Sequence, residues 1–262
     1  MTFDMNGKVA VVTGAGSGLG RASAILFAEV GAKVVVADIS VEDGQATVDL
    51  IRKAGGEASY VKTDVTNASD VKAMVDFAVE KYGRLDYAHN NAGISGPKAL
   101  VEDFPEDAFD KVMEINVKGI FLCMKYEIPA MLKQGGGAIA NTSSGAGLVG
   151  TERAIAYVAS KHAIVGMSKA AALDYCKAGI RVNTVCSGIM STPMTEKGIQ
   201  DAIDATGLPR EKIEAGLIAG MIPLGHLAQP REVAQAAVWL CSDAASFVTG
   251  AALSADGGFA AR

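Results

Sequence analysis

The chain has 262 residues, of which 50% are hydrophobic and 20% are charged, and its formal net charge is −5. A chain of this length buries roughly three quarters of its unfolded surface, so it forms a core without disulfides or metal ions. These proportions exclude a disordered or collagen-like protein. A mildly acidic chain without a basic cluster lacks the positive face that a nucleic-acid binder needs.

The first residues contain no basic stretch followed by an apolar run, so no secretory signal is predicted. Glycines and charged residues interrupt the apolar stretches well short of a membrane span, and we expect no membrane association. The 4 cysteines are scattered and the 3 histidines are dispersed, without the ligand spacing of a zinc site. We therefore expect a cytoplasmic protein with reduced thiols and no metal.

Short apolar runs alternate with longer stretches of helical spacing along the chain. Strands are predicted, in order, at residues 8–13, 33–38, 58–62, 85–89, 137–142, 181–186 and 251–255. Helices are predicted at residues 19–30, 41–54, 68–82, 106–133, 153–177 and 230–243. Continuously apolar strands that alternate with helices are typical of a parallel sheet covered on both faces. The sequence predicts one α/β domain over residues 1–262, a Rossmann-like, doubly wound sheet of about seven strands.

Residues 188–226, called the lid segment below, form the one long stretch without a predicted element. They carry Pro193, Pro209, Pro223 and several glycines. A loop of this length within a compact domain is usually a lid or a binding segment. We expect it to cover the substrate.

A glycine-rich turn joins the first predicted strand to the first predicted helix. It has the spacing G-x-x-x-G-x-G, through Gly14, Gly18 and Gly20, and not the usual dinucleotide spacing G-x-G-x-x-G. Glycines let the backbone approach a ligand, and the free N–H groups of a helix start attract an anion. The strand–turn–helix context predicts a phosphate-binding loop, and a plain turn is the structural alternative.

Asp38 ends the second predicted strand. A carboxylate at this position accepts hydrogen bonds from ribose hydroxyls and repels a 2′-phosphate. Ser17 in the loop and Ile39-Ser40 after Asp38 supply no cation for such a phosphate. The pattern favours NAD over NADP, and the alternative is that Asp38 only caps the turn into the next helix.

Tyr157 and Lys161 are four residues apart within a predicted helix, so their side chains share one face. An ammonium beside a phenol stabilises the phenolate and draws the tyrosine pKa, about 10 when unperturbed, toward working pH. A tyrosine in that setting acts as an acid and a base. Taken alone, the pair is better explained as an ordinary pair on a helix surface.

The pair does not stand alone, because further motifs accompany it in a fixed order. They are Gly14/Gly18/Gly20, Asp38, Asp64-Val65, Asn90-Asn91-Ala92-Gly93, Asn116, Ser143-Ser144 and Tyr157 with Ser160-Lys161. With this set, the chain resembles the short-chain dehydrogenase/reductase family over nearly its whole length.

The resemblance implies an NAD-dependent oxidoreductase that interconverts a secondary alcohol and its ketone by hydride transfer. Tyr157 would be the acid/base, and Lys161 would lower its pKa and hold the nicotinamide ribose. Ser144 would bind the substrate oxygen, and Asn116 would complete a proton relay through water and Lys161. The residues that would bind the cofactor are Gly14, Ser17, Gly18, Leu19, Gly20, Asp38, Ile39, Asp64, Val65, Asn90, Ala92, Gly93, Tyr157, Lys161, Gly188, Ile189 and Thr192.

Two positions depart from the family pattern. Ser187-Gly188 stands where the family commonly has Pro-Gly, which loosens the loop that leads to Ile189 and Thr192. His89 stands in place of an apolar residue before Asn90, and we expect it to be a packed strand residue.

The predicted substrate walls are residues 94–100, residues 145–153 and the lid segment. The lid segment has a net charge of −2, from Lys197, Arg210 and Lys212 against Glu196, Asp201, Asp204, Glu211 and Glu214. A carrier-linked substrate calls for a basic rim, so we expect an uncharged, small or cyclic secondary alcohol instead. The alternatives are an NADPH-dependent 3-oxoacyl thioester reductase and a dinucleotide-binding subunit without turnover.

Small residues recur along residues 153–177, including Ala159, Ala163 and Gly166. They permit close packing of helices, and the resemblance implies that such helices pair between subunits of a homotetramer. The alternative is packing of this helix within one chain.

Overall fold

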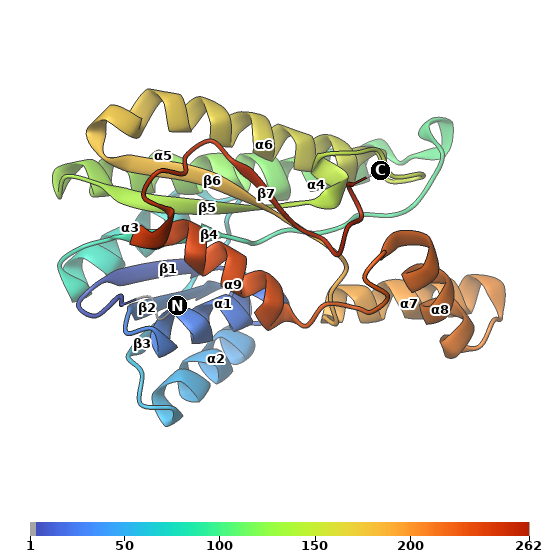
Figure 1. The fold of residues 1–262 in the computed structure, drawn as a ribbon, viewed down its shortest axis with the longest axis horizontal. Helices are drawn as coiled ribbons and strands as arrows, with labels where there is room; N and C mark the ends of the chain where they lie inside the picture. Colours follow the sequence, from blue (N-terminus) through green and yellow to red (C-terminus); the bar gives the residue numbers. More distant parts are fainter. Residues whose placement is uncertain (1–3, 262) are drawn as a thin grey trace.

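Seven short strands pair side by side, all in parallel, in the computed structural model, which describes residues 4–261 (Figure 1). Their order in the sheet is β3-β2-β1-β4-β5-β6-β7. The strands are β1 Val9–Thr13, β2 Lys33–Asp38, β3 Ala58–Lys62, β4 Tyr87–Asn90, β5 Gly137–Ser144, β6 Ile180–Ser187 and β7 Ala252–Ala255. The order changes direction between β1 and β4, which confirms the predicted doubly wound sheet.

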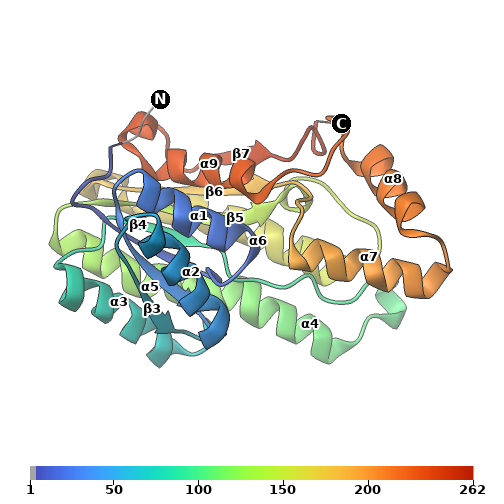
Figure 2. The ribbon, with the colours of Figure 1, turned by 90° about the horizontal axis from the view of Figure 1, so that it is seen from below.

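Helices cover both faces of the sheet (Figures 1 and 2). One layer contains α1 Gly18–Glu29, α2 Val41–Lys53 and α9 Pro230–Cys241. The other contains α3 Ala68–Tyr82, α5 Gly119–Lys133 and α6 Ile155–Tyr175. Alternate residues of β1 serve the two layers, since Ala10 and Val12 pack in the first and Val9 and Val11 in the second. No helix within residues 4–261 combines the length and the apolarity needed to cross a membrane.

The helix predicted over residues 106–133 is divided into three parts. α4 Glu106–Met113 runs into a π-helical turn, Glu114–Lys118, and then into α5. A π-helical turn inserts an extra residue into the helix and is frequent at functional sites. Here it carries Asn116, whose side chain is fully buried.

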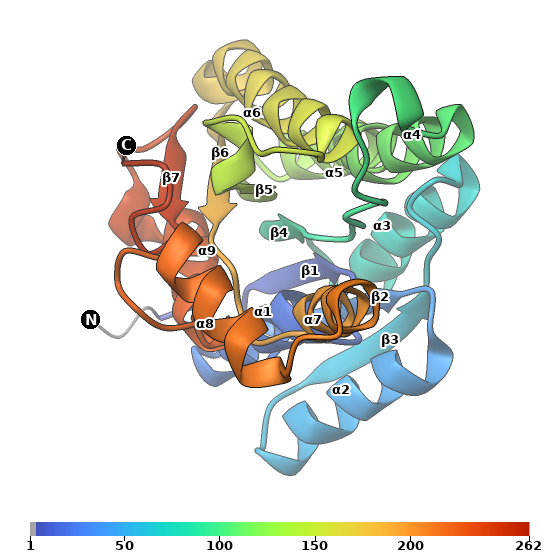
Figure 3. The ribbon, with the colours of Figure 1, turned by 90° about the vertical axis from the view of Figure 1, so that its right-hand side faces the viewer.

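The lid segment differs from the prediction because most of it is helical. α7 Pro193–Thr206 and α8 Arg210–Met221 lie beyond the carboxyl end of β6 (Figure 3). Pro193 occupies the first turn of α7, where its missing N–H costs nothing, and Gly207 ends that helix in the left-handed region. Pro193 and Gly207 therefore bound α7 instead of preventing it, and Gly198 and Gly216 are accommodated inside the two helices.

Candidate active site

The glycine-rich loop is closed tightly on itself and on the chain after β4. A Cβ on Gly20 would overlap the Gly14 carbonyl oxygen, and one on Gly14 would lie 2.9 Å from the Ala92 Cα. Gly14 and Gly18 have φ values of 61° and 49°, in the left-handed region. Ser17 precedes α1 without capping it through its side chain, so N–H groups at the helix start remain for a ligand. The loop fits the pyrophosphate of a dinucleotide.

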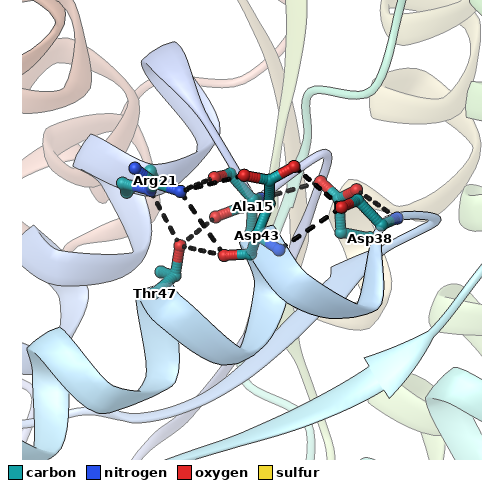
Figure 4. A network of polar contacts seen from close by, with 7 residues as sticks. Ala15, Arg21, Asp38, Asp43 and Thr47 are labelled. Atoms are coloured by element: carbon teal, nitrogen blue, oxygen red, sulfur yellow. Dashed lines mark hydrogen bonds and ion pairs between the residues drawn. The ribbon is translucent and has the colours of Figure 1, made fainter.

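Asp38 holds the loop from the end of β2 (Figure 4). Its carboxylate accepts hydrogen bonds from the backbone N–H of Gly16, at 2.7 Å, and of Ser40, at 2.9 Å. Asp38 therefore orients the turn into α2, which is the structural role given above as the alternative to ribose binding. A carboxylate has about four acceptor positions, so two remain for ribose hydroxyls.

Arg21 and Thr47 hold the same loop from the other side, and the sequence analysis did not single out either residue. The Arg21 guanidinium donates to the Gly16 carbonyl oxygen and, through Nε, to the Thr47 Oγ1 at 3.0 Å. The Thr47 hydroxyl lies 2.9 Å from the Ala15 carbonyl oxygen. The loop is thus organised by its own protein contacts, and only its glycines carried a signal in the sequence.

Thr13 joins the glycine-rich loop to the turn that follows β4. Its hydroxyl oxygen accepts from the backbone N–H of Asn91, at 2.9 Å, and of Ala92, at 3.2 Å. The Asn91 side-chain amide donates in return to the Thr13 carbonyl oxygen at 3.2 Å. These bonds hold two segments predicted to bind the cofactor against each other.

The Asn90 side chain points into the core, away from the glycine-rich loop. Its amide donates to the Glu127 carboxylate at 2.9 Å and to the Asn141 side-chain oxygen at 3.0 Å, and all three side chains are fully buried. Burial raises the pKa of Glu127 to about 7, against the opposing effect of the Asn90 hydrogen bond. The Asn90 side chain therefore organises the layer beneath the cleft, so a contact with the cofactor is left to its backbone.

The Lys161 side chain extends from α6 to the carboxyl end of β5. It is 5% exposed, and its Nζ donates to the Thr142 carbonyl oxygen at 3.0 Å. Burial lowers the pKa of Lys161 to about 8, because the protein interior disfavours the ammonium form. A Cβ on Gly93 would lie 3.7 Å from this Nζ and 3.0 Å from the Asn116 Oδ1, so the glycine lets the chain after β4 pass close to Asn116 beside the amine.

Tyr157 sits one helical turn before Lys161 on α6, with the lysine Nζ 5.4 Å from the centre of its ring. Burial raises the pKa of Tyr157, and a hydrogen bond with Ser144 acts in the opposite direction. The sequence predicts a Tyr157 pKa lowered by Lys161. In the structure burial outweighs the other influences, and the lysine is turned toward Thr142.

Ser144 ends β5 opposite Ser187 of β6. The Ser144 hydroxyl lies 3.4 Å from the Ser187 carbonyl oxygen and accepts from the backbone N–H of Ala146 at 3.2 Å. Ser143 faces the helix layer instead, where its hydroxyl donates to the Lys161 carbonyl oxygen at 2.8 Å. Tyr157, Ser144 and Lys161 thus form one cluster above the end of β5.

Asn116 ties the first substrate wall to α6. Its side-chain oxygen accepts from the backbone N–H of Ile94 at 2.8 Å, and its amide donates to the Ile94 carbonyl oxygen at 2.9 Å. The same amide donates to the Ser160 hydroxyl at 3.0 Å. Its side chain therefore sets the position of the wall, and a relay toward Lys161 would have to pass through the Asn116 backbone.

His89 is fully buried on β4, as expected for a packed strand residue. Its Nε2 lies 2.8 Å from the Thr142 hydroxyl. Burial lowers the pKa of His89 to about 3, so the ring is neutral. A neutral ring in this position supports Thr142, whose carbonyl oxygen holds Lys161.

The start of the lid segment lies beside the glycine-rich loop. A Cβ on Gly18 would lie 3.2 Å from the Thr192 Cγ2, and the Thr192 hydroxyl caps α7. A Cβ on Gly188 would lie 2.6 Å from the Asp256 Cα, so this position requires glycine. The Ile189 carbonyl oxygen accepts a hydrogen bond from the backbone N–H of Ala228, which joins the start of the segment to the chain just after its end.

The remaining predicted cofactor residues differ in what they offer. The Leu19 side chain is buried in the core, whereas that of Ile39 is 60% exposed. Asp64 accepts from the backbone N–H and hydroxyl of Thr66, at 2.9 Å and 2.8 Å. Val65 is buried against α5, where a Cβ on Gly119 would meet it. Within residues 4–261, no three His, Cys, Asp or Glu side chains are grouped so as to hold a metal ion.

Comparison with known proteins places this site in a family. A family model described as enoyl-(acyl carrier protein) reductase matches residues 14–260. A 2,5-dichloro-2,5-cyclohexadiene-1,4-diol dehydrogenase of Sphingobium indicum is 45% identical over 98% of this chain and 99% of its own length. A cyclohexanol dehydrogenase of an Acinetobacter species is 42% identical over 100% of this chain and 98% of its own.

Among solved structures, an actinorhodin polyketide ketoreductase variant with NADPH has a TM-score of 0.93 and 35% identity, over 97% of this chain and 98% of that one. Each match spans nearly the whole of both chains, and the family model covers the glycine-rich loop together with the Ser144, Tyr157 and Lys161 cluster. The chain belongs to the short-chain dehydrogenase/reductase family and is an oxidoreductase.

Proposed function

We propose that the protein interconverts a secondary, cyclic alcohol and its ketone with NAD(H). The observation that carries the proposal is the placement of Tyr157 and Ser144 beside the buried Lys161, whose Nζ lies 5.4 Å from the centre of the Tyr157 ring, next to a loop shaped for a dinucleotide. The two relatives whose names specify cyclic alcohols support the substrate class.

The bound dinucleotide supplies a ring that accepts or donates hydride. In alcohol oxidation, the Tyr157 oxygen takes the hydroxyl proton while hydride leaves the carbinol carbon. In ketone reduction, Tyr157 returns that proton to the carbonyl oxygen. Ser144 donates a hydrogen bond to the same oxygen, so the developing charge is stabilised without a metal.

Lys161 and Asn116 hold the other components in place. Lys161 binds the nicotinamide ribose and stabilises the Tyr157 phenolate through its charge. Asn116 fixes Ile94 and Ser160, so it holds the substrate wall at a constant distance from α6. The predicted contacts of Asp64, Val65, Gly188, Ile189 and Thr192 with the cofactor belong to this proposal.

The preference for NAD rests on Asp38. Its carboxylate is fixed by Gly16 and Ser40, and it keeps acceptor capacity for the two ribose hydroxyls. A 2′-phosphate would meet that negative charge at close range. The alternative cofactor is NADPH, which the solved ketoreductase carries. The alternative function that goes with it is reduction of a 3-oxoacyl thioester.

The proposal includes a cytoplasmic homotetramer. Thiols at Cys123, Cys176, Cys186 and Cys241 are unpaired, which suits a reducing compartment. The outer face of α6 carries Gly166 and Leu173, both exposed in the single chain, and these residues permit close contact with a second copy.

The test is a measurement of reduced-nicotinamide absorbance with purified protein. NAD(H) and NADP(H) are each combined with cyclic alcohols, linear alcohols, thioester-linked ketones and the matching products. Turnover of cyclic substrates with NAD(H), and little with NADP(H), supports the proposal. Turnover confined to NADPH and thioesters would contradict both its cofactor and its substrate, and dinucleotide binding without turnover of any substrate would favour the non-catalytic alternative.

A further inference from the structure

Two acidic side chains, not one, stand around Gly16 of the glycine-rich loop. A Cβ on Gly16 would lie 2.8 Å from an Asp38 carboxylate oxygen and 2.8 Å from the Asp43 Cβ. Asp38 comes from the end of β2 and Asp43 from the first turn of α2. Figure 4 shows the Asp43 side chain between Arg21 and Asp38. The ribose-binding corner is therefore more acidic than Asp38 alone makes it.

A cation is also present at this corner. The Arg21 guanidinium lies 3.7 Å from an Asp43 carboxylate oxygen and 3.4 Å from the Asp43 carbonyl oxygen, and its side chain is 32% exposed. The other Asp43 carboxylate oxygen accepts from the Ser40 hydroxyl at 2.7 Å, which fixes the orientation of the carboxylate. Arg21 is thus paired with Asp43, in addition to its hydrogen bonds to Gly16 and Thr47, beside the carboxylate that would meet the ribose.

We propose that Asp43 is a second selectivity residue, which neutralises Arg21 and so withholds it from the 2′-phosphate of NADP. Arginine is the residue that accommodates this phosphate in dinucleotide-binding folds. With Asp43 in place, replacement of Asp38 still leaves a negative charge and an occupied guanidinium next to the phosphate. The inference rests on the proposed preference for NAD.

The competing explanation is that Asp43 serves only the helix, because acidic residues in a first turn stabilise the helix dipole. Glu42 separates the two explanations. It occupies the same first turn of α2 and carries the same charge. Its side chain has no hydrogen bond or ion pair among residues 4–261, so Glu42→Gln is a matched control for Asp43→Asn.

The experiment measures the dissociation constants of NADH and NADPH by fluorescence titration of the full-length protein. The quantity compared is the ratio of the NADPH constant to the NADH constant. Asp43→Asn is expected to lower this ratio about threefold to fivefold, as for one partly exposed charge pair, whereas Glu42→Gln leaves it within twofold. Asp38→Ser with Asp43→Asn should lower the ratio by more than the product of the single changes.

Variants of Arg21 test most directly whether this side chain contacts the 2′-phosphate. In the Asp38→Ser, Asp43→Asn background, Arg21→Met should restore the high ratio and Arg21→Lys should retain much of the lowered one. A purely structural role of Arg21 would weaken NADH and NADPH alike and leave the ratio unchanged. Equal ratios for Asp43→Asn and Glu42→Gln, or no effect of Arg21→Met, would overturn the inference. A wild-type ratio near one would instead contradict the proposed NAD preference itself.

Discussion

Lys161 is buried, in an environment that disfavours its charged ammonium form. Its pKa is lowered to about 8 by burial, and the Thr142 carbonyl oxygen is its hydrogen-bond acceptor. The spacing of Tyr157 and Lys161 could be read from the sequence because four residues span one helical turn. The lowered pKa could not, since it depends on which strands and loops close over the amine.

The lysine pKa predicts the pH dependence of ketone reduction. Under the proposed mechanism, the reaction needs a neutral Tyr157, whose pKa is raised by burial, and a charged Lys161. We expect kcat/KM for the ketone to be level below about pH 8 and to fall tenfold per pH unit above it. A pH–rate profile that stays level to about pH 10 would contradict the assignment.

Glu127 is the buried acid that the sequence could not identify, because its partner Asn90 lies 37 positions away on a strand. Its pKa is raised from 4.5 to about 7, so between these values the folded protein holds a proton that the unfolded chain has lost. The free energy of unfolding therefore falls with rising pH across this window. Glu127→Gln lacks this proton and should remove a dependence on the order of 3 kcal/mol.

The measurement is urea unfolding of both proteins at several pH values within and above this window. The wild type should lose stability relative to Glu127→Gln as the pH rises, and the difference should then stay constant above about pH 8. Parallel curves for the two proteins would show that Glu127 is ionised in the folded state throughout.

At the scale of elements, the sequence predicts the glycine-rich loop but not the helices of the lid segment or the π-helical turn. Gly14, Gly18 and Gly20 were identified by spacing, and the structure shows a loop too tight for a side chain at Gly20. The helices α7 and α8 are not predicted because prolines and glycines are typical of loops, although Pro193, Gly207 and Pro209 lie at helix ends and Gly198 and Gly216 lie within the helices. The π-helical turn at Asn116 also has no signal in the sequence, where residues 106–133 have the spacing of one helix.

Gly20→Ala tests the loop as a cradle for the dinucleotide. The added methyl would overlap the Gly14 carbonyl oxygen, so the loop must move away from its phosphate-binding shape. We expect the dissociation constant for NADH to rise at least about tenfold, measured by fluorescence titration. Gly198→Ala in α7, where a Cβ meets no atom, is the control and should leave binding unchanged.

At the scale of the whole molecule, the alternation of strands and helices was enough to predict the order of the layers. The pattern of strands and helices does not show which surface would contact other subunits. Gly166 on α6 has no atom within 4 Å of its Cβ position, so the single chain offers no reason for a glycine there. A second copy packed on α6 would offer one.

Gly166→Leu tests the proposed assembly. The larger side chain has room in the single chain, and it should reduce the tetramer to smaller species because it blocks close approach of two helices. Sedimentation velocity gives the oligomeric state, and Gly198→Leu on α7 is the matched control. An unchanged tetramer in Gly166→Leu would place the interface on another face.

The most direct test of the account compares wild type and Tyr157→Phe in the NAD-linked oxidation of cyclohexanol and related cyclic alcohols. Phenylalanine keeps the ring and removes only the hydroxyl that exchanges the proton. The account predicts turnover by the wild type and a loss of about a thousandfold in kcat for the variant, with NADH affinity retained. Equal rates for the two proteins would contradict the central claim that Tyr157 is the acid and base of this enzyme.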